Sequence, residues 1–188
     1  MIPAQELRES IWGAWRLAHL DPGGMRWLNL SSDGFFRSFF AAVLLAPAYF
    51  LVAWVGSMPG PDPANAPSRS IVADLVSYPL LWLVFPLLLA AAAKPLGLAR
   101  QYAAGVIALN WAQVVIMAVV LPITLLALTG ALGPFGALLY LSAYAASLFY
   151  TWFVLRTALE TTAGIAAALT AAAELLWLLV QHSIAKLF

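Results

Sequence analysis

The sequence predicts an all-α, polytopic membrane protein in which five transmembrane helices follow an interfacial amphipathic helix. Composition is the first reason, because 64% of the 188 residues are hydrophobic and only 9% are charged, whereas an average soluble domain has about 25% charged residues. The second reason is a set of five apolar stretches, each long enough to cross a hydrocarbon core about 30 Å thick. These stretches cover residues 38–56, 70–93, 102–128, 135–155 and 162–185.

Residues 1–36 differ in composition from the rest and precede a five-helix transmembrane domain over residues 37–188. Apolar side chains recur in this first segment at intervals of three and four, which predicts an amphipathic helix. They are Leu7, Ile11, Ala14, Trp15 and Ala18, with Trp12 and Trp27 nearby. These tryptophans suit the headgroup layer of a membrane, because indole has an apolar body and a polar N–H. The predicted helix ends at Asp21-Pro22-Gly23-Gly24. Since acidic residues interrupt the segment, we interpret it as a mature cytoplasmic or interfacial segment and not as a signal peptide.

The basic residues predict the orientation in the membrane. Seven of the nine Lys and Arg residues fall on one side of the predicted spans, and two fall on the other. The first group is Arg8, Arg16, Arg26, Arg37, Lys94, Arg100 and Arg156, and the second is Arg69 and Lys186. Because cytoplasmic loops carry the excess of Lys and Arg, we expect a cytoplasmic N-terminus and a periplasmic C-terminus in a bacterial inner membrane.

Glu174 is the strongest candidate for a functional residue inside the membrane. An acid at the bilayer centre costs at least about 2.5 to 3.5 kcal/mol. Glu174 lies about 18 Å along the fifth span and Gln113 about 16 Å along the third, which runs in the same direction. With Asn110 and Thr170 they predict a polar seam between these spans. The seam either specifies helix packing, with Glu174 protonated, or binds a proton, an ion or a polar substrate group. Packing is the favoured interpretation.

Asp74 and Tyr78 form a second candidate site, near the outer interface. Asp74 lies four residues into the second span, and Tyr78 lies one turn deeper on the same face. An acid at a helix N-terminus is also favoured by the helix dipole, which is the simpler interpretation of Asp74.

Small residues at intervals of four open the fifth span. Gly164, Ala168 and Ala172 predict a smooth face that lets another helix backbone come close. We expect this helix-packing face to contact another span of the same chain, in preference to another subunit.

The sequence offers no constellation that supports catalysis. Cysteine is absent, and the two histidines, His19 and His182, are predicted on opposite sides of the membrane. No phosphate-binding loop or nucleophilic triad is present. We therefore predict no enzyme activity, no metal site, no cofactor and no nucleic-acid partner.

The predicted layout of a cytoplasmic amphipathic segment, five spans and short loops resembles the Yip family, membrane proteins of the Ypt- or Rab-interacting type, and its bacterial relatives. The segment Asp74-Leu75-Val76-Ser77-Tyr78-Pro79 is similar to the Asp-Leu-Tyr-Gly-Pro motif of that family, with two residues inserted and the Gly missing. Arg100-Gln101-Tyr102-Ala103 and the small-residue fifth span are also similar to bacterial members. The resemblance implies a scaffold or adaptor with no catalytic residues.

Three functional hypotheses follow. The first is a non-catalytic accessory, scaffold or assembly protein that acts through membrane lipids and a protein partner or a homo-oligomer. The second is a small transporter or ion- or proton-conducting protein that uses Glu174. The third is a lipid-handling protein, suggested by the interfacial tryptophans and by prolines that bend the spans.

Overall fold

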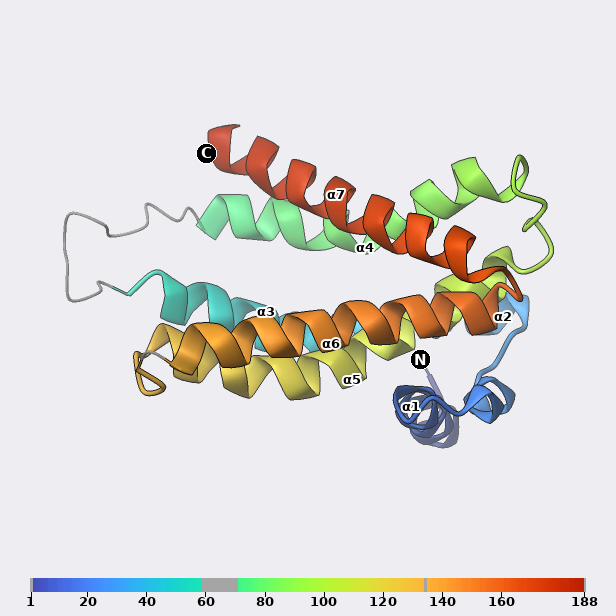
Figure 1. Cartoon of the computed structure of the whole chain (residues 1–188), viewed down its shortest axis with the longest axis horizontal. Helices are drawn as coiled ribbons and strands as arrows, with labels where there is room; N and C mark the ends of the chain where they lie inside the picture. The colour runs from blue at the N-terminus through green and yellow to red at the C-terminus, as the bar shows by residue number, and fades with distance from the viewer. Residues whose placement is uncertain (1, 59–70, 134, 188) are drawn as a thin grey trace.

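A computed structural model describes residues 2–58, 71–133 and 135–187 of the chain, and every regular element in these ranges is helical (Figure 1). The N-terminal region contains a helix, a 3₁₀ turn and a short helix: α1 (Ala4–Ala18), η1 (Pro22–Trp27) and α2 (Ser32–Ser38). Five longer helices follow: α3 (Phe40–Gly56), α4 (Ile71–Ala93), α5 (Tyr102–Leu128), α6 (Phe135–Ala158) and α7 (Ala163–Leu187).

Five helices within the described ranges are long and apolar enough to cross a membrane, which confirms the predicted fold class. The first of them extends over Ser32–Gly56 and so includes α2, beginning earlier than the predicted boundary at residue 38. The Ser31 side chain explains this start, because its Oγ accepts a hydrogen bond from the Gly34 backbone N–H at 3.1 Å and caps the helix.

The long helices lie side by side in two groups (Figure 1). In one group α5 packs between α3 and α6, and in the other α7 packs along α4. The groups join where α7 meets α6 and where α4 meets α3 and α5. The N-terminal helix α1 appears nearly end-on in Figure 1, so it runs across the long helices. This is the direction expected of a helix that lies in the membrane surface.

The apolar face predicted on α1 packs on the bundle together with small residues beside it. Ala14 is buried and Leu7, Ile11 and Ala18 pack against the core cluster, whereas Trp15 is 47% exposed. Ser10, Gly13 and Leu17 are buried as well, and the small ones among them let α1 approach its neighbours closely. A Cβ atom added to Gly24 of η1 would lie 2.4 Å from the Gly13 carbonyl oxygen, so these two backbones are in direct contact.

Polar contacts also hold α1 in place. Glu6 forms an ion pair with Arg37 of α2, with Oε2 2.8 Å from Nη1, and its Oε1 accepts a hydrogen bond from the Asn29 amide at 3.0 Å. Across the interface with α6, the Tyr150 hydroxyl donates to the Ala14 carbonyl oxygen at 2.7 Å. Because donor and acceptor are both buried, neither can exchange this contact for water.

Asp21 organises the turn after α1. Its carboxylate accepts a hydrogen bond from the Gly23 backbone N–H at 2.8 Å and another from the Arg16 side chain at 2.6 Å. The backbone hydrogen bond from Gly23 and the Arg16 guanidinium hold the pKa of Asp21 below its usual value.

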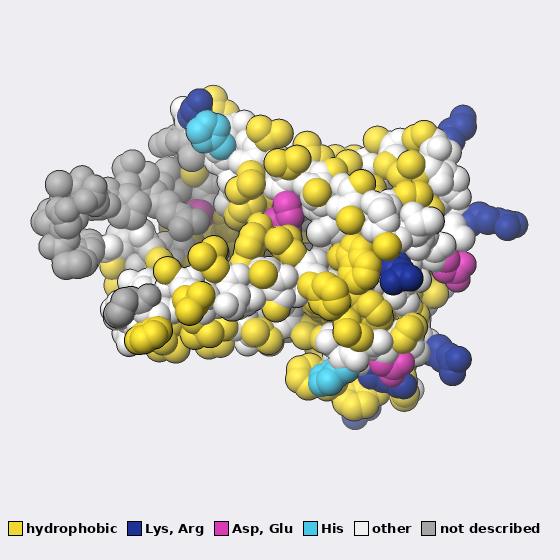
Figure 2. All heavy atoms as spheres, viewed as in Figure 1, with side chains coloured by type: hydrophobic (Ala, Val, Ile, Leu, Met, Phe, Trp, Pro, Cys, Tyr) yellow, Lys and Arg dark blue, Asp and Glu magenta, His cyan; other side chains and the backbone are white. Residues whose placement is uncertain are grey.

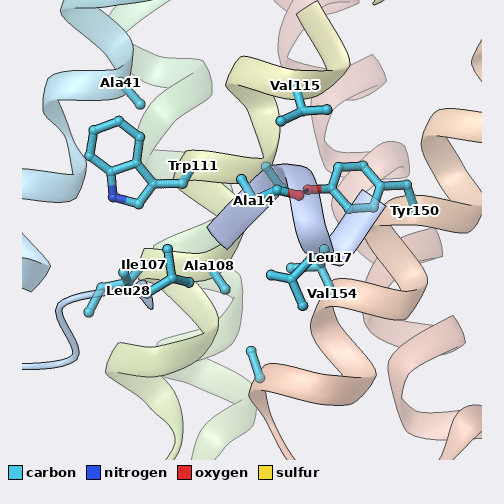
Figure 3. Packing of buried hydrophobic residues seen from close by; sticks show 12 residues of the cluster. Ala14, Leu17, Leu28, Ala41, Ile107, Ala108, Trp111, Val115, Tyr150 and Val154 are labelled. Carbon is cyan, nitrogen blue, oxygen red and sulfur yellow. Dashed lines mark hydrogen bonds between the residues drawn. The ribbon is translucent and has the colours of Figure 1, made fainter. Parts of the chain in front are cut away.

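One core cluster lies beneath α1 and α2, and a second lies among α4, α5, α6 and α7. On α5 the described buried residues are Gly105–Ala112 and Val115, while the second half of this helix has none. Figure 3 shows Tyr150 and Val154 of α6 pointing toward Ala14 and Leu17 of α1, while Trp111 of α5 points to the other side, toward Ala41 of α3. The N-terminal segment therefore completes the core at one end of the bundle.

Charged side chains mark that same end. Figure 2 shows most of the Lys and Arg side chains at the end of the molecule where α1 and α2 lie. On the face shown, the surface between this end and the opposite one is predominantly apolar. An apolar belt between charged ends is the surface expected of a membrane-spanning bundle.

Candidate functional site

Glu174 lies on α7 opposite a tyrosine of α6. The Tyr144 hydroxyl donates a hydrogen bond to Glu174 Oε2 at 2.9 Å, and both side chains are half-buried. Sequence reasoning missed Tyr144 as the partner of Glu174. The signal was present, because a phenol in the middle of an apolar span needs a hydrogen-bond partner of its own.

The predicted polar seam between the third and fifth spans is not formed. Asn110 is buried and donates through Nδ2 to Ser38 Oγ at 2.9 Å, so it connects α5 to α2. The Ser38 hydroxyl in turn donates a hydrogen bond to the Phe35 carbonyl oxygen at 2.7 Å. Thr170 donates within α7, to the Ala166 carbonyl oxygen at 2.9 Å. Gln113 is half-buried, and its side chain has no hydrogen-bond partner among the described residues.

The arrangement of the helices explains why the predicted seam is not formed. The main neighbours of α7 are α4 and α6, whereas α5 packs mainly against α6, α3 and the N-terminal segment. Equal depth in the membrane is therefore not sufficient to bring Gln113 and Glu174 together.

Asp74 and Tyr78 lie in one aromatic cluster near the other end of the bundle. Asp74 is only 8% exposed, and the Tyr49 hydroxyl of α3 donates to its Oδ1 at 3.3 Å. The Tyr49 and Tyr78 rings are 4.7 Å apart between centroids, and the Tyr78 hydroxyl donates to the Ala42 carbonyl oxygen. The predicted pair is thus joined through Tyr49, which the sequence alone did not indicate. These contacts hold α4 against α3.

The small-residue face of α7 points away from the rest of the chain. Gly164 and Ala168 are exposed and Ala172 is half-buried, and a Cβ atom on Gly164 would meet no other heavy atom within 4 Å. The expectation that this face contacts another span of the chain is therefore wrong. The opposite face of α7, which carries Ala166 and Leu169, is the one that the bundle buries.

Acidic and histidine side chains are scattered through the described part of the chain. Within it, no three His, Asp or Glu residues come close enough together to hold a metal ion. The polar features of the long helices are instead paired contacts between neighbours, such as Tyr144 with Glu174 and Tyr49 with Asp74.

The fold and these contacts define the class: an all-α membrane protein with five candidate transmembrane helices and an N-terminal helix docked across them. In comparisons with known proteins, no family model, no curated protein and no solved structure matches this chain.

Proposed function

We propose that this protein is a non-catalytic accessory or scaffold subunit that binds a protein partner within the membrane along the face of α7 that carries Gly164, Ala168 and Ala172. The observation that carries the proposal is the exposure of that face. In lipid the hydrophobic effect does not drive helices together, so association depends on close packing of small residues. Gly164 and Ala168 offer such a surface, and the described part of the chain leaves both of them exposed. The partner is a second copy of this chain or another membrane protein.

A bulky residue on this face tests the proposal. Ala168→Trp is expected to reduce the amount of partner bound by about tenfold or more, because the indole keeps the partner backbone at a distance. Ala146→Trp on the exposed surface of α6 is the matched control and is expected to leave the complex intact. The measurement is the native mass of the protein extracted gently from its own membrane. A wild-type monomer, or an Ala168→Trp variant that retains its partner, contradicts the proposal.

We further propose that the protein resides in a bacterial inner membrane with its N-terminus in the cytoplasm. The gathering of Lys and Arg at the end that holds α1 and α2 supports this orientation. Because the sequence has no cysteine, single-cysteine variants can be labelled without background. In intact cells, a membrane-impermeant maleimide is expected to label Ser183→Cys near the C-terminus and to leave Gln5→Cys unlabelled until the cells are opened. The reverse pattern contradicts the orientation.

The Yip-like layout fits the same role, since that resemblance implies a scaffold or adaptor. A second candidate function, a small transporter or ion- or proton-conducting protein, is favoured by the contact between Tyr144 and Glu174. A half-buried acid between two membrane-spanning helices is the kind of group that binds a proton or an ion during transport.

A further inference from the structure

A groove of about 440 Å³ opens where α1 crosses α5. One wall is formed by Trp12 and Trp15 of α1, and the other by Val115, Ala118 and Val119 of α5. The only charged side chain that lines it is Arg8. Its size falls within the range of about 300 to 1,000 Å³ that is usual for small-molecule sites.

The position of the groove on α5 places it on the hydrocarbon side of α1. Val115 is the middle residue of α5, with thirteen residues on either side, between Tyr102 and Leu128. The buried contacts of α1 are with the earlier residues of α5, Ala108 to Val115, and the groove continues from there to Val119. It therefore runs from the level of the interfacial helix toward the bilayer centre.

Two of the four arginines from α1 to α2, Arg8 and Arg26, have no ion pair within the described part of the chain, and of these two only Arg8 lines the groove. Arg16 forms an ion pair with Asp21, and Arg37 forms one with Glu6. Arg8 has neither an ion pair nor a side-chain hydrogen bond within the part of the chain that the structure describes. An unpaired guanidinium beside an apolar groove is suited to bind a ligand that has an anionic group attached to an apolar body. Phosphate is such an anionic group, because Arg binds its oxygens in a bidentate manner.

We propose that this groove binds one membrane phospholipid, with an acyl chain between α1 and α5 and its phosphate held by Arg8. Trp12 and Trp15 are 49% and 47% exposed, and they offer flat apolar surfaces along which the chain lies. The lipid completes the interface between the N-terminal helix and the bundle, so it stabilises α1 in its docked position. This role is independent of the α7 face.

Fluorescence quenching tests the site directly. The full-length protein in mild detergent is titrated with phosphatidylglycerol that carries bromine on its acyl chains, because bromine quenches nearby indoles. We expect saturable quenching, and we expect Ala118→Phe and Arg8→Gln each to weaken the apparent affinity by about tenfold. Ala146→Phe and Arg100→Gln are matched controls on exposed surfaces outside the groove and are expected to behave as the wild type.

Three results would overturn the proposal. The first is quenching that does not saturate and is equal in all five proteins, since that indicates only the surrounding lipid annulus. The second is an equal loss of affinity in Arg8→Gln and Arg100→Gln, which indicates general charge attraction. The third is a photo-cross-link from a benzophenone on Ala118→Cys to a protein in native membranes, in place of a mass increase equal to one phospholipid.

Discussion

Gly24→Ala is expected to destabilise the protein by about 1 to 3 kcal/mol and to release the N-terminal helix from the bundle. The added methyl carbon would lie 2.4 Å from the Gly13 carbonyl oxygen and 3.0 Å from the Leu17 backbone nitrogen. Both atoms belong to the backbone of α1, so neither can rotate away as a side chain could. The two segments must separate, and Leu17 then loses the packing that buries it completely.

The measurement is resistance to unfolding in a titration with sodium dodecyl sulfate, together with the rate of proteolysis in the N-terminal segment. Gly164→Ala is the matched control, because the same methyl group there meets no other heavy atom within 4 Å. We expect Gly164→Ala to lose no stability. Equal resistance in Gly24→Ala and the wild type would show that α1 and η1 are not in direct backbone contact.

Glu174→Gln gives the largest expected functional effect, because it tests the transport candidate at its single ionisable group. If the carboxyl carries a proton or an ion, an amide that does not titrate in its place reduces flux by about a hundredfold or more. The fold is expected to survive, since the amide oxygen of Gln still accepts the hydrogen bond from Tyr144. The measurement is proton and ion flux into liposomes that contain the purified variant.

Gln113→Leu is the control for this prediction. Because Gln113 has no hydrogen-bond partner among the described residues, its replacement is expected to leave flux unchanged. Wild-type flux that persists in Glu174→Gln would eliminate transport through this residue. Liposomes that show no wild-type flux would eliminate the transport candidate and assign Glu174 to the packing of α7 on α6.

Composition and periodicity were sufficient to predict the fold class and the existence of each long helix. The first half of α5 shows why they did not predict the packing. Apart from Asn110 and Gln113 its side chains are almost all apolar, so hydropathy cannot separate the face that contacts α1 from one that contacts lipid, and only the assembled bundle defines the difference.

The docked face of α1 was predicted only in part. Periodicity selected Leu7, Ile11, Ala14 and Ala18, which pack on the core, but Ser10 and Gly13 do not count as hydrophobic and are buried beside them. Of the candidate site residues, Glu174 lies in the middle of α7, but its hydrogen-bond partner is on α6 and not on the third span, where it was predicted. A tyrosine on the adjacent helix lies closer than an amide at the same depth on a helix that is not a main neighbour.

The hydrogen bond between Tyr150 and Ala14 can form only late in the synthesis of the chain. The two residues are separated by 136 positions along the chain. During synthesis α1 leaves the ribosome first, but its carbonyl meets the tyrosine hydroxyl only after α6 has been made. Until then the face with Ser10, Gly13 and Leu17 has no α6 surface to rest on, and long-range contacts of this kind form late. The hydrogen bond between Tyr150 and Ala14 therefore forms only when the first four membrane spans have been made.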